Sequence, residues 1–248
     1  MSFQTVLYEK DDGLAWVTLN RPERLNAYNV QMRDDLYEIV SAIRDDPEVL
    51  AGIFKGAGER AFCAGADLTE FGTAPSPVIA RQVRWERDLW GLLLSIPKPL
   101  IAAVHGYCLG SGLELSLTCD LRVAAEDARF GLPEVSLGII PAAGGSQTLP
   151  RTIGRGRALG MMLTGDAIDA QEALGIGLVN RVVPRETLYQ AAEAVARRIM
   201  AHDPVVVHAA KLAVVRGLDL PLAEGLALEA QYVALIWKSR RRPGPEPV

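Results

Sequence analysis

Cysteine, histidine and aromatic residues are all scarce in this chain of 248 residues, which has three cysteines, three histidines and 6% aromatic residues. Cys63, Cys108 and Cys119 form no Cys-x-x-Cys pair, and any disulfide would leave one of them over, so we expect reduced, partly buried thiols. The histidines lack metal-ligand spacing with carboxylates or cysteines. The sequence therefore argues against a disulfide scaffold and predicts no metal site.

Long apolar runs and an excess of basic charge are also missing. The apolar run over residues 100–104 is followed at once by His105 and Gly106, far short of the roughly 20 residues that span a membrane. The net charge of −4, with acidic and basic residues interspersed, differs from the basic field of a nucleic-acid-binding protein. Residues 1–12 resemble neither a signal peptide nor a transit leader. We expect a soluble, cytoplasmic protein with no nucleic-acid or membrane partner.

The chain does have an ordinary globular composition, with 49% hydrophobic and 23% charged residues, and enough length to bury a large core. Its apolar patterns predict strands over residues 3–9 and 14–19, joined by a hairpin turn at Asp11-Asp12-Gly13. Asn29 is a good N-cap for a following helix. The apolar residues of that helix recur on one face, which contains Met32, Leu36, Ile39, Val40 and Ile43.

Strands and helices alternate through most of the chain. Further strands are predicted over 50–55, 100–105 and 121–125, with a long helix over 77–95 and a short helix over 113–118. This alternation is typical of parallel strands joined by right-handed crossovers. After residue 155 helices dominate, and we expect them over 157–163, 170–174, 187–200, 204–215 and 222–237. The prediction is an α/β core over residues 1–195 and a helical carboxyl-terminal subdomain over residues 196–248.

Two glycine-rich turns follow strands of the predicted core. The first runs from Phe62 to Leu68, and the second runs from His105 to Glu114 and opens the short helix. Small residues let ligand atoms approach backbone N–H groups, and a helix start adds the positive end of its dipole. One such turn is weak evidence alone, because a tight turn that simply requires glycine is the commoner explanation. Neither turn has a Gly-x-Gly-x-x-Gly or Walker pattern, which argues against those nucleotide sites.

Two glutamates lie in or near these segments. Glu114 falls in the first turn of the short helix, where it could simply complement the helix dipole. Glu134 follows Pro133, where it could be an exposed loop carboxylate. Taken singly, each of these structural explanations is the simpler one.

Taken together, these segments resemble the enoyl-CoA hydratase/isomerase (crotonase) superfamily over about residues 3–236. The resemblance rests on the joint order and spacing of Leu19-Asn20-Arg21-Pro22, Leu25-Asn26-Ala27, Ala64–Leu68, Gly106–Leu115, Cys119-Asp120, Phe130–Glu134, Gly138–Pro141, Ile168–Ala173 and Gly177–Val179. It implies a crotonase-like α/β spiral of repeated ββα units with a helical subdomain at the carboxyl end.

The resemblance also implies roles for individual residues. The backbone N–H groups of Ala66 and Ser111 would form an oxyanion hole for the thioester oxygen, in which each donor is typically worth ~3–4 kcal/mol. Glu114 and Glu134 would hold one water between them, with Glu114 as the base toward C3 and Glu134 as the acid toward C2. Because such a pair titrates as a unit, the residues alone leave the assignment of acid and base open.

The substrate implied is an acyl-CoA thioester, so that coenzyme A is part of the substrate and no separate cofactor is expected. The resemblance suggests that it is contacted by Arg24, Ala27, Ala64, Asp67, Leu68 and Ala142. In the predicted 77–95 helix, Trp85, Leu89 and Trp90 would either wall the acyl pocket or pack in the core. Family members assemble as homotrimers, often paired into hexamers, through the helical subdomain, which would also act as a partial lid over CoA.

The activity implied is enoyl-CoA hydration, the reversible addition of water across the 2,3 double bond, as used in fatty acid and lipid metabolism. Family isomerases can manage with one glutamate, at the position of Glu134, so the presence of Glu114 as well favours hydration. Two alternatives stay open. One is an isomerase or another crotonase-type acyl-CoA enzyme, and the other is a non-catalytic CoA-binding scaffold that kept the fold.

The sequence departs from the family pattern in several places. Ala142 replaces a usual glycine, and its Cβ could crowd the water or the acyl group. Ser111 also replaces a usual glycine but keeps the backbone donor, and His105 replaces a commoner asparagine. At the chain end, residues 240–242 are three arginines in a proline-rich tail instead of the family's last helix, which puts the lid in doubt. These arginines are either a solvated end or a contact to the CoA 3′-phosphate.

Overall fold

Six strands form the main sheet of the protein, in the order β1-β2-β3-β5-β7-β10. The computed structural model describes residues 3–70, 73 and 76–240. The sheet contains β1 (Val6–Asp11), β2 (Leu14–Leu19), β3 (Ala51–Gly56), β5 (Leu100–Val104), β7 (Leu121–Ala125) and β10 (Arg181–Val183). The first two strands form the predicted antiparallel hairpin, and every other pair is parallel. The predicted parallel core is therefore confirmed, and β10 is a further strand that is not predicted from the sequence.

A smaller sheet contains four short strands, β4 (Ala61–Cys63), β6 (Tyr107–Leu109), β8 (Arg129–Gly131) and β9 (Ile168–Asp169). Strands β4, β6 and β8 pair in parallel, and each follows directly on a strand of the main sheet. The chain thus repeats a strand–strand unit three times while alternating between the two sheets. This is the spiral of repeated ββα units that the resemblance implies.

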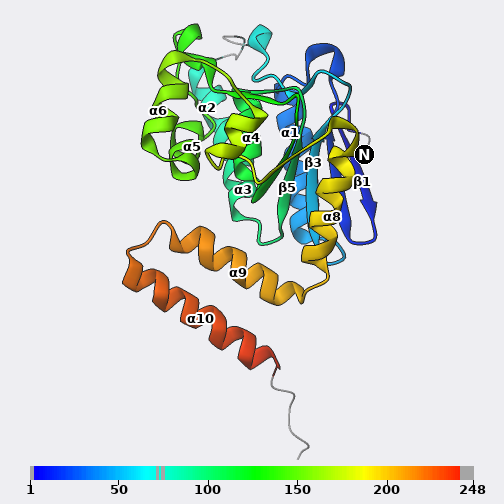
Figure 1. The fold of residues 1–248 in the computed structure, drawn as a ribbon, viewed down its shortest axis with the longest axis vertical. Coiled ribbons are helices and arrows are strands. Elements are labelled where there is room, and N and C mark those ends of the chain that lie inside the picture. Colours follow the sequence, from blue (N-terminus) through cyan, green and yellow to red (C-terminus); the bar gives the residue numbers. More distant parts are fainter. Residues whose placement is uncertain (1–2, 71–72, 74–75, 241–248) are drawn as a thin grey trace, which may run out of the picture.

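Helices cover both faces of the main sheet (Figure 1). Phe54 packs in one hydrophobic cluster with α1 (Val30–Asp45), while its neighbour Ile53 packs in another with α8 (Leu188–Met200). Because successive side chains of a strand point to opposite faces, the two clusters lie on opposite sides of the sheet. The body is completed by α4 (Ser111–Thr118), α5 (Gly145–Ile153), α6 (Arg155–Thr164), α7 (Ala170–Gly175) and 3-10 turns at Pro22–Arg24, Leu68–Glu70, Pro133–Leu137 and Arg185–Thr187.

The prediction of a single long helix over residues 77–95 is wrong. Two helices occupy this segment, α2 (Pro77–Glu86) and α3 (Leu89–Ser95). The Asp88 side chain starts the second helix by accepting the Gly91 N–H at 3.0 Å. The apolar pattern continues through residue 88, but the aspartate divides the segment into two helices. Its side chain competes for backbone N–H groups that would otherwise donate within one continuous helix.

The last two helices, α9 (Pro204–Gly217) and α10 (Leu222–Arg240), pack against each other and stand apart from the body (Figure 1). They confirm the helices predicted over 204–215 and 222–237. Lys211 joins α9 to the body, since its Nζ lies 2.8 Å from an Asp120 carboxyl oxygen and donates to the Lys98 carbonyl at 2.9 Å.

Helix α8 spans the predicted boundary between the two subdomains. It packs on the main sheet and runs through residue 195, the predicted end of the α/β core. The helical subdomain expected over 196–248 is kept as a proposal, with α9 and α10 as its described part. No helix within residues 3–70, 73 and 76–240 is both long enough and apolar enough to cross a membrane.

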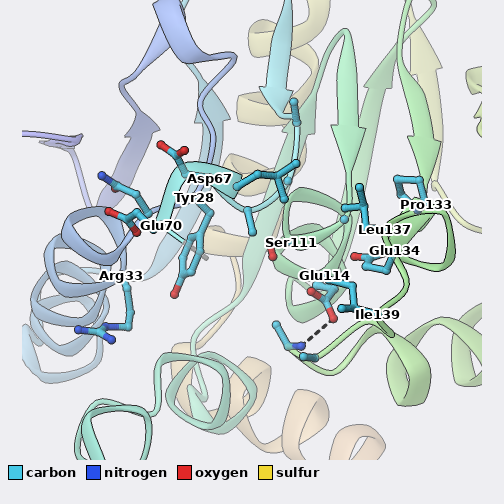
Figure 2. A pocket seen from close by; sticks show the side chains of 18 of the residues that line it. Tyr28, Arg33, Asp67, Glu70, Ser111, Glu114, Pro133, Glu134, Leu137 and Ile139 are labelled. Carbon is cyan, nitrogen blue, oxygen red and sulfur yellow. Dashed lines mark hydrogen bonds between the residues drawn. The ribbon is translucent and has the colours of Figure 1, made fainter. Parts of the chain in front are cut away.

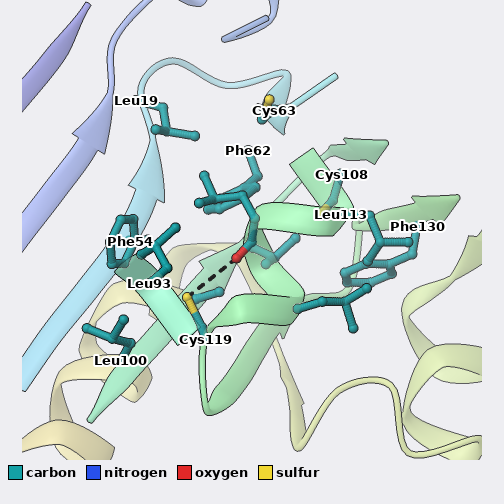
Figure 3. Packing of buried hydrophobic residues seen from close by; sticks show 14 of the residues in the cluster. Leu19, Phe54, Phe62, Cys63, Leu93, Leu100, Cys108, Leu113, Cys119 and Phe130 are labelled. Atoms are coloured by element: carbon teal, nitrogen blue, oxygen red, sulfur yellow. Dashed lines mark hydrogen bonds between the residues drawn. The ribbon is translucent and has the colours of Figure 1, made fainter. Parts of the chain in front are cut away.

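All three cysteines are free and buried in the core (Figure 3). Burial raises the pKa of the Cys63 thiol to about 11 and that of the Cys119 thiol to about 12, so both stay protonated near neutral pH. The thiols are reduced, as expected, and more deeply buried than expected. His105, directly after β5, is also fully buried, and burial lowers its pKa to about 4. It is therefore neutral at physiological pH, like the asparagine that is commoner in the family.

Candidate active site

A cavity of about 500 Å³ opens where the two glycine-rich turns meet. Its walls come from the first turn of α1, the turn after β4, the start of α4 and the segment after β8. Glu114 and Glu134 lie together at one end, whereas Arg33 and Glu70 lie at the other (Figure 2). The structure thus brings both glutamates and both turns to one cavity.

Glycines let the two turns touch each other. Gly65 and Gly110 have positive φ angles of 112° and 51°, and a Cβ on Gly110 would lie 3.5 Å from the Gly65 Cα. Gly112 packs closely on β4, because a Cβ there would overlap the Cys63 carbonyl oxygen. The start of α4 is therefore fixed by backbone-to-backbone contact that leaves no room for a side chain.

The backbone N–H groups of Ala66 and Ser111 lie beside this contact. Ala66 forms a parallel bridge with Tyr28, in which the Tyr28 N–H donates to the Gly65 carbonyl and the Asp67 N–H donates to the Tyr28 carbonyl. This bridge does not use the Ala66 N–H. Ser111 is the first residue of α4, where N–H groups have no intrahelical acceptor. Neither N–H donates to another described residue, and both residues line the cavity, which is what an oxyanion hole requires.

Glu114 is only 2% exposed and follows Ser111 by three residues, so the two side chains share one face of α4. Its Oε1 accepts the N–H groups of Ala143 and Gly145, each at 2.8 Å. These donors come from the segment after β8 and not from the helix's own first turn, so the helix dipole alone does not explain the side chain's position. Two main-chain donors stabilise a negative charge on this carboxyl group.

Glu134 lies in the 3-10 turn after β8 and is 8% exposed, so it is not an exposed loop carboxylate. Its Oε2 is buried and has no hydrogen-bond partner among the described residues. Burial, to which the nearby charge of Glu114 adds, raises the pKa of Glu134 above its ordinary value. The other oxygen, Oε1, would lie 3.0 Å from a Cβ on Gly110, so the glycine of the second turn makes room for this carboxyl group.

The two carboxyl groups therefore differ in surroundings although they share one cavity. Glu114 has main-chain donors that favour its charged form, while Glu134 is desolvated and favours its neutral form. A pair of this kind can supply a base and an acid at the same time. The residues alone leave the two roles open, and their surroundings favour Glu114 as the base and Glu134 as the acid.

Known proteins of similar sequence and fold identify the family. The family model described as enoyl-CoA hydratase/isomerase matches residues 9–244. This chain belongs to the enoyl-CoA hydratase/isomerase family. It is 40% identical to the short-chain-enoyl-CoA hydratase of Clostridium acetobutylicum, over 93% of this chain and 88% of that protein. It is also 40% identical to the (E)-benzylidenesuccinyl-CoA hydratase of Thauera aromatica, over 94% and 89% of the two chains.

The fold agrees with this assignment. A crystal structure of enoyl-CoA hydratase from Bacillus anthracis matches with a TM-score of 0.88 and 39% sequence identity, covering 93% of this chain and 90% of that one. The family and the crotonase fold expected from the sequence are confirmed.

The family resemblance assigns CoA contacts to six residues. Four of them line the cavity, namely Ala64, Asp67, Leu68 and Ala142. Arg24 and Ala27 are not part of its lining. Ala142 is next to Ala143, whose N–H holds Glu114, so the methyl group that departs from the family pattern borders the cavity close to the candidate base.

Arg21 and Asn26 position the loop that carries Ala27. Arg21 donates from Nη2 to an Asp67 carboxyl oxygen at 2.9 Å and from Nη1 to the Ala27 carbonyl at 2.6 Å. Asn26 is fully buried with φ of 54°, and its Nδ2 donates to the carbonyls of Ala57 and Ala61. Both residues lie in segments that carry the family resemblance, but no role is predicted for them there. The structure shows that they tie residues 21–27 to the segments before and after β4.

Much of the cavity wall is not foreseen from the sequence. The lining residues for which no role at a site is predicted include Tyr28, Val30, Arg33, Glu70, Leu137, Ile139 and Ile140. Helical periodicity identifies the buried face of α1, but it gives no signal for first-turn residues that border a cavity. Of the three residues proposed to wall the acyl pocket, only Trp90 lines it, because Leu89 is buried in the core and Trp85 is 67% exposed.

Two expectations about the site stay predictions. Arg240 ends α10, and Arg241 and Arg242 lie outside the described residues, so a contact of these arginines with the 3′-phosphate of CoA is untested. The second expectation is that the protein has no metal site. In the part of the chain that the structure describes, no group of three or more His, Cys, Asp or Glu side chains is arranged to hold a metal ion.

Proposed function

We propose that this chain is an enoyl-CoA hydratase, a hydro-lyase that adds water reversibly across the 2,3 double bond of a 2-enoyl-CoA thioester. The observation that carries the proposal is the pair of buried carboxyl groups with opposite surroundings, Glu114 and Glu134, beside the unused N–H groups of Ala66 and Ser111. Relatives that are 40% identical over most of the chain are named as hydratases of CoA thioesters, which supports it.

In the proposed reaction, the thioester oxygen accepts hydrogen bonds from the N–H groups of Ala66 and Ser111. Glu114 takes a proton from water while the water oxygen bonds to C3, and the electron pair of the double bond moves toward the thioester to form an enolate. The two donors stabilise that charge by ~3–4 kcal/mol each. Glu134 gives its proton to C2, which completes the 3-hydroxyacyl-CoA product. A proton passed from Glu114 to Glu134 through water restores both groups.

Isomerisation is the second candidate, because it uses the same oxyanion donors and needs only one carboxyl group. The two main-chain donors to Glu114 favour hydration, since a reaction that only moves a proton between carbons would not need a second carboxylate held in its charged form. The third candidate is a non-catalytic scaffold, which crowding of the site by the Ala142 methyl group would favour. It is less well supported, because a cavity of about 500 Å³ remains beside Ala142.

Crotonyl-CoA distinguishes these candidates. Hydration removes the conjugation between the double bond and the thioester, so we expect micromolar enzyme to lower the absorbance of that conjugated system to an equilibrium level. An unchanged absorbance would contradict the hydratase proposal. In that case tight binding of acyl-CoA without turnover, measured by calorimetry, would indicate the scaffold.

The acyl group is not decided by the relatives, because those named for a short-chain enoyl group and for a benzylidenesuccinyl group are equally similar to this chain. The apolar lining, which includes Trp90, Leu137 and Ile139, fits a short or medium apolar chain. We propose that CoA enters only as part of the substrate, that no separate cofactor is needed, and that the enzyme acts in cytoplasmic fatty acid metabolism. The proposed CoA contacts remain Arg24, Ala27, Ala64, Asp67, Leu68 and Ala142.

The α9–α10 hairpin supports the further proposal that the protein assembles as a trimer or as a hexamer of two trimers. Only Ala209 is buried within α9, whereas Val214, Leu218, Leu222 and Leu235 are each at least 60% exposed. Exposed apolar surface of this extent usually marks a protein–protein interface. Further copies of this chain are the partners that the resemblance implies.

Light scattering on the purified protein is expected to give three or six times the mass of one chain. Leu235→Asp places a charge on the exposed face of α10 and is expected to shift the mass toward that of one chain. Leu7→Asp is a suitable control, because Leu7 is 44% exposed on β1, far along the chain from the hairpin. A single-chain mass for the unaltered protein at micromolar concentration would contradict the assembly.

A further inference from the structure

The hydroxyl group of Ser111 is not used in the mechanism above, which needs only the backbone N–H of this residue. Two other hydroxyl groups of α4 donate to carbonyls of their own helix, Ser116 to Leu113 at 2.9 Å and Thr118 to Leu115 at 2.7 Å. The Ser111 Oγ makes no hydrogen bond within the described part of the chain, and the residue is half-buried in the cavity wall. Its donor and its acceptor capacity are therefore available to a ligand.

The position of this hydroxyl group connects it to the two carboxyl groups. Ser111 precedes Glu114 by three residues on one face of α4. Ser111 also directly follows Gly110, and the Glu134 Oε1 atom lies beside Gly110. The other carboxyl oxygen of Glu134, Oε2, is buried and has no partner among the described residues. Figure 2 shows the Ser111 hydroxyl on the same side as Glu114 and Glu134, away from Arg33 and Glu70. Three polar groups therefore border one small part of the cavity.

A water molecule that attacks C3 needs two hydrogen-bond acceptors, because it has two hydrogens and must keep a lone pair directed at carbon. Glu114, as the base, accepts one of these hydrogens. Glu134 is less suited to accept the other, because the proton that it delivers must point at C2 and its Oε2 atom is buried. A serine hydroxyl is a good acceptor that stays neutral throughout the reaction.

We propose that the Ser111 Oγ accepts a hydrogen bond from the attacking water, which makes Ser111 a catalytic residue for hydration. The inference rests on the proposed hydratase function and adds a third group to its water site. Orienting the water by two acceptors directs its lone pair at C3 and leaves the Glu134 proton free to reach C2.

Ser111→Ala keeps the backbone N–H and removes only the hydroxyl. We expect kcat for crotonyl-CoA hydration to fall about 5- to 10-fold, the effect of one hydrogen bond, with little change in KM because the thioester contacts are unaltered. Ser111→Thr restores a hydroxyl and is expected to recover part of the loss. Ser95→Ala is the matched control, because the Ser95 hydroxyl donates only to Leu92 of its own helix.

Exchange of the C2 protons of butyryl-CoA with deuterated water provides a second readout. This exchange needs the oxyanion donors and a carboxyl group but no attacking water. We expect Ser111→Ala to exchange at the unaltered protein's rate while its hydration is slowed. Equal loss of both activities would mean that the hydroxyl acts on the thioester oxygen or only on the shape of the site, and would overturn the inference.

Two further outcomes separate this inference from the function on which it rests. Unchanged hydration in Ser111→Ala, with an active parent enzyme, would overturn the inference alone. A parent enzyme that exchanges C2 protons but does not hydrate crotonyl-CoA would overturn both.

Discussion

Replacing Glu134 or Glu114 by glutamine is expected to lower kcat for crotonyl-CoA hydration about 100-fold or more. Glutamine keeps the size of the side chain, but it has no proton to deliver to C2 at position 134 and cannot take a proton from water at position 114. The measurement is the initial rate of absorbance loss, with thermal unfolding recorded to show that each variant is folded. Glu9→Gln, on the exposed edge of β1, is the control and should keep the parent rate.

The pH dependence of kcat separates the two roles. Burial and the charge of Glu114 raise the pKa of Glu134, so this group stays protonated to higher pH than an ordinary glutamate. Hydration that uses it as the acid should therefore decline as pH rises through that raised pKa, whereas the base must be ionised and fails as pH falls. Glu134→Gln should lose the alkaline decline and Glu114→Gln the acidic one. The reverse pattern would exchange the roles, and near-parental turnover in either variant would remove that residue from the mechanism.

Gly112→Ala is expected to lower kcat about 100- to 1000-fold, the usual effect of losing an oxyanion donor. An alanine Cβ at this position would overlap the Cys63 carbonyl oxygen, which is backbone and cannot rotate away. The start of α4 must then move away from β4, and it carries both the Ser111 N–H and the Glu114 carboxyl group. Rates on crotonyl-CoA and thermal unfolding should be measured together, because overpacking also destabilises a protein by about 1–3 kcal/mol.

Gly160→Ala is the matched control for this prediction. Gly160 is exposed in the middle of α6, and a Cβ there would meet no atom within 4 Å. It should keep the parent rate and, because alanine favours helix, should not lower stability. A folded Gly112→Ala enzyme with parental kcat would contradict the claim that this close backbone contact sets the geometry of the oxyanion donors.

The elements with strong periodicity are predictable because local pattern and tertiary burial agree. In α1, all five apolar residues expected on one face are buried, and the Asn29 side chain accepts the Met32 N–H at 2.9 Å as the expected cap. Helices α9 and α10 are predictable for a different reason, their length, because much of their apolar surface is exposed and burial gives them no clear face.

The second sheet is not predictable in this way. Its strands have three residues or fewer, too few for alternation to be recognised. They are stabilised by pairing over long distances along the chain, such as Ala61 with Tyr107 and Tyr107 with Arg129. Only the family resemblance points to these strands, through the spiral that it implies.

The residues of the candidate site are predictable from the sequence, but the surroundings that set the charge of each glutamate are not. The turn segments identify Ala66, Ser111 and both glutamates from the sequence. The surroundings that distinguish base from acid come from elsewhere, because the N–H groups that hold Glu114 belong to residues 29 and 31 positions further along the chain. The burial of Glu134 likewise depends on how the turn after β8 packs, for which the sequence has no local signal.

Mass spectrometry of crotonyl-CoA incubated with the enzyme in water labelled with heavy oxygen most directly tests whether this site hydrates an enoyl thioester. The expected product is heavier than the substrate by one labelled water, with the label in a hydroxyl group on C3, and it should form about 100-fold more slowly with either glutamine variant. Substrate recovered unchanged, or a product of the same mass with its double bond moved, would contradict the account.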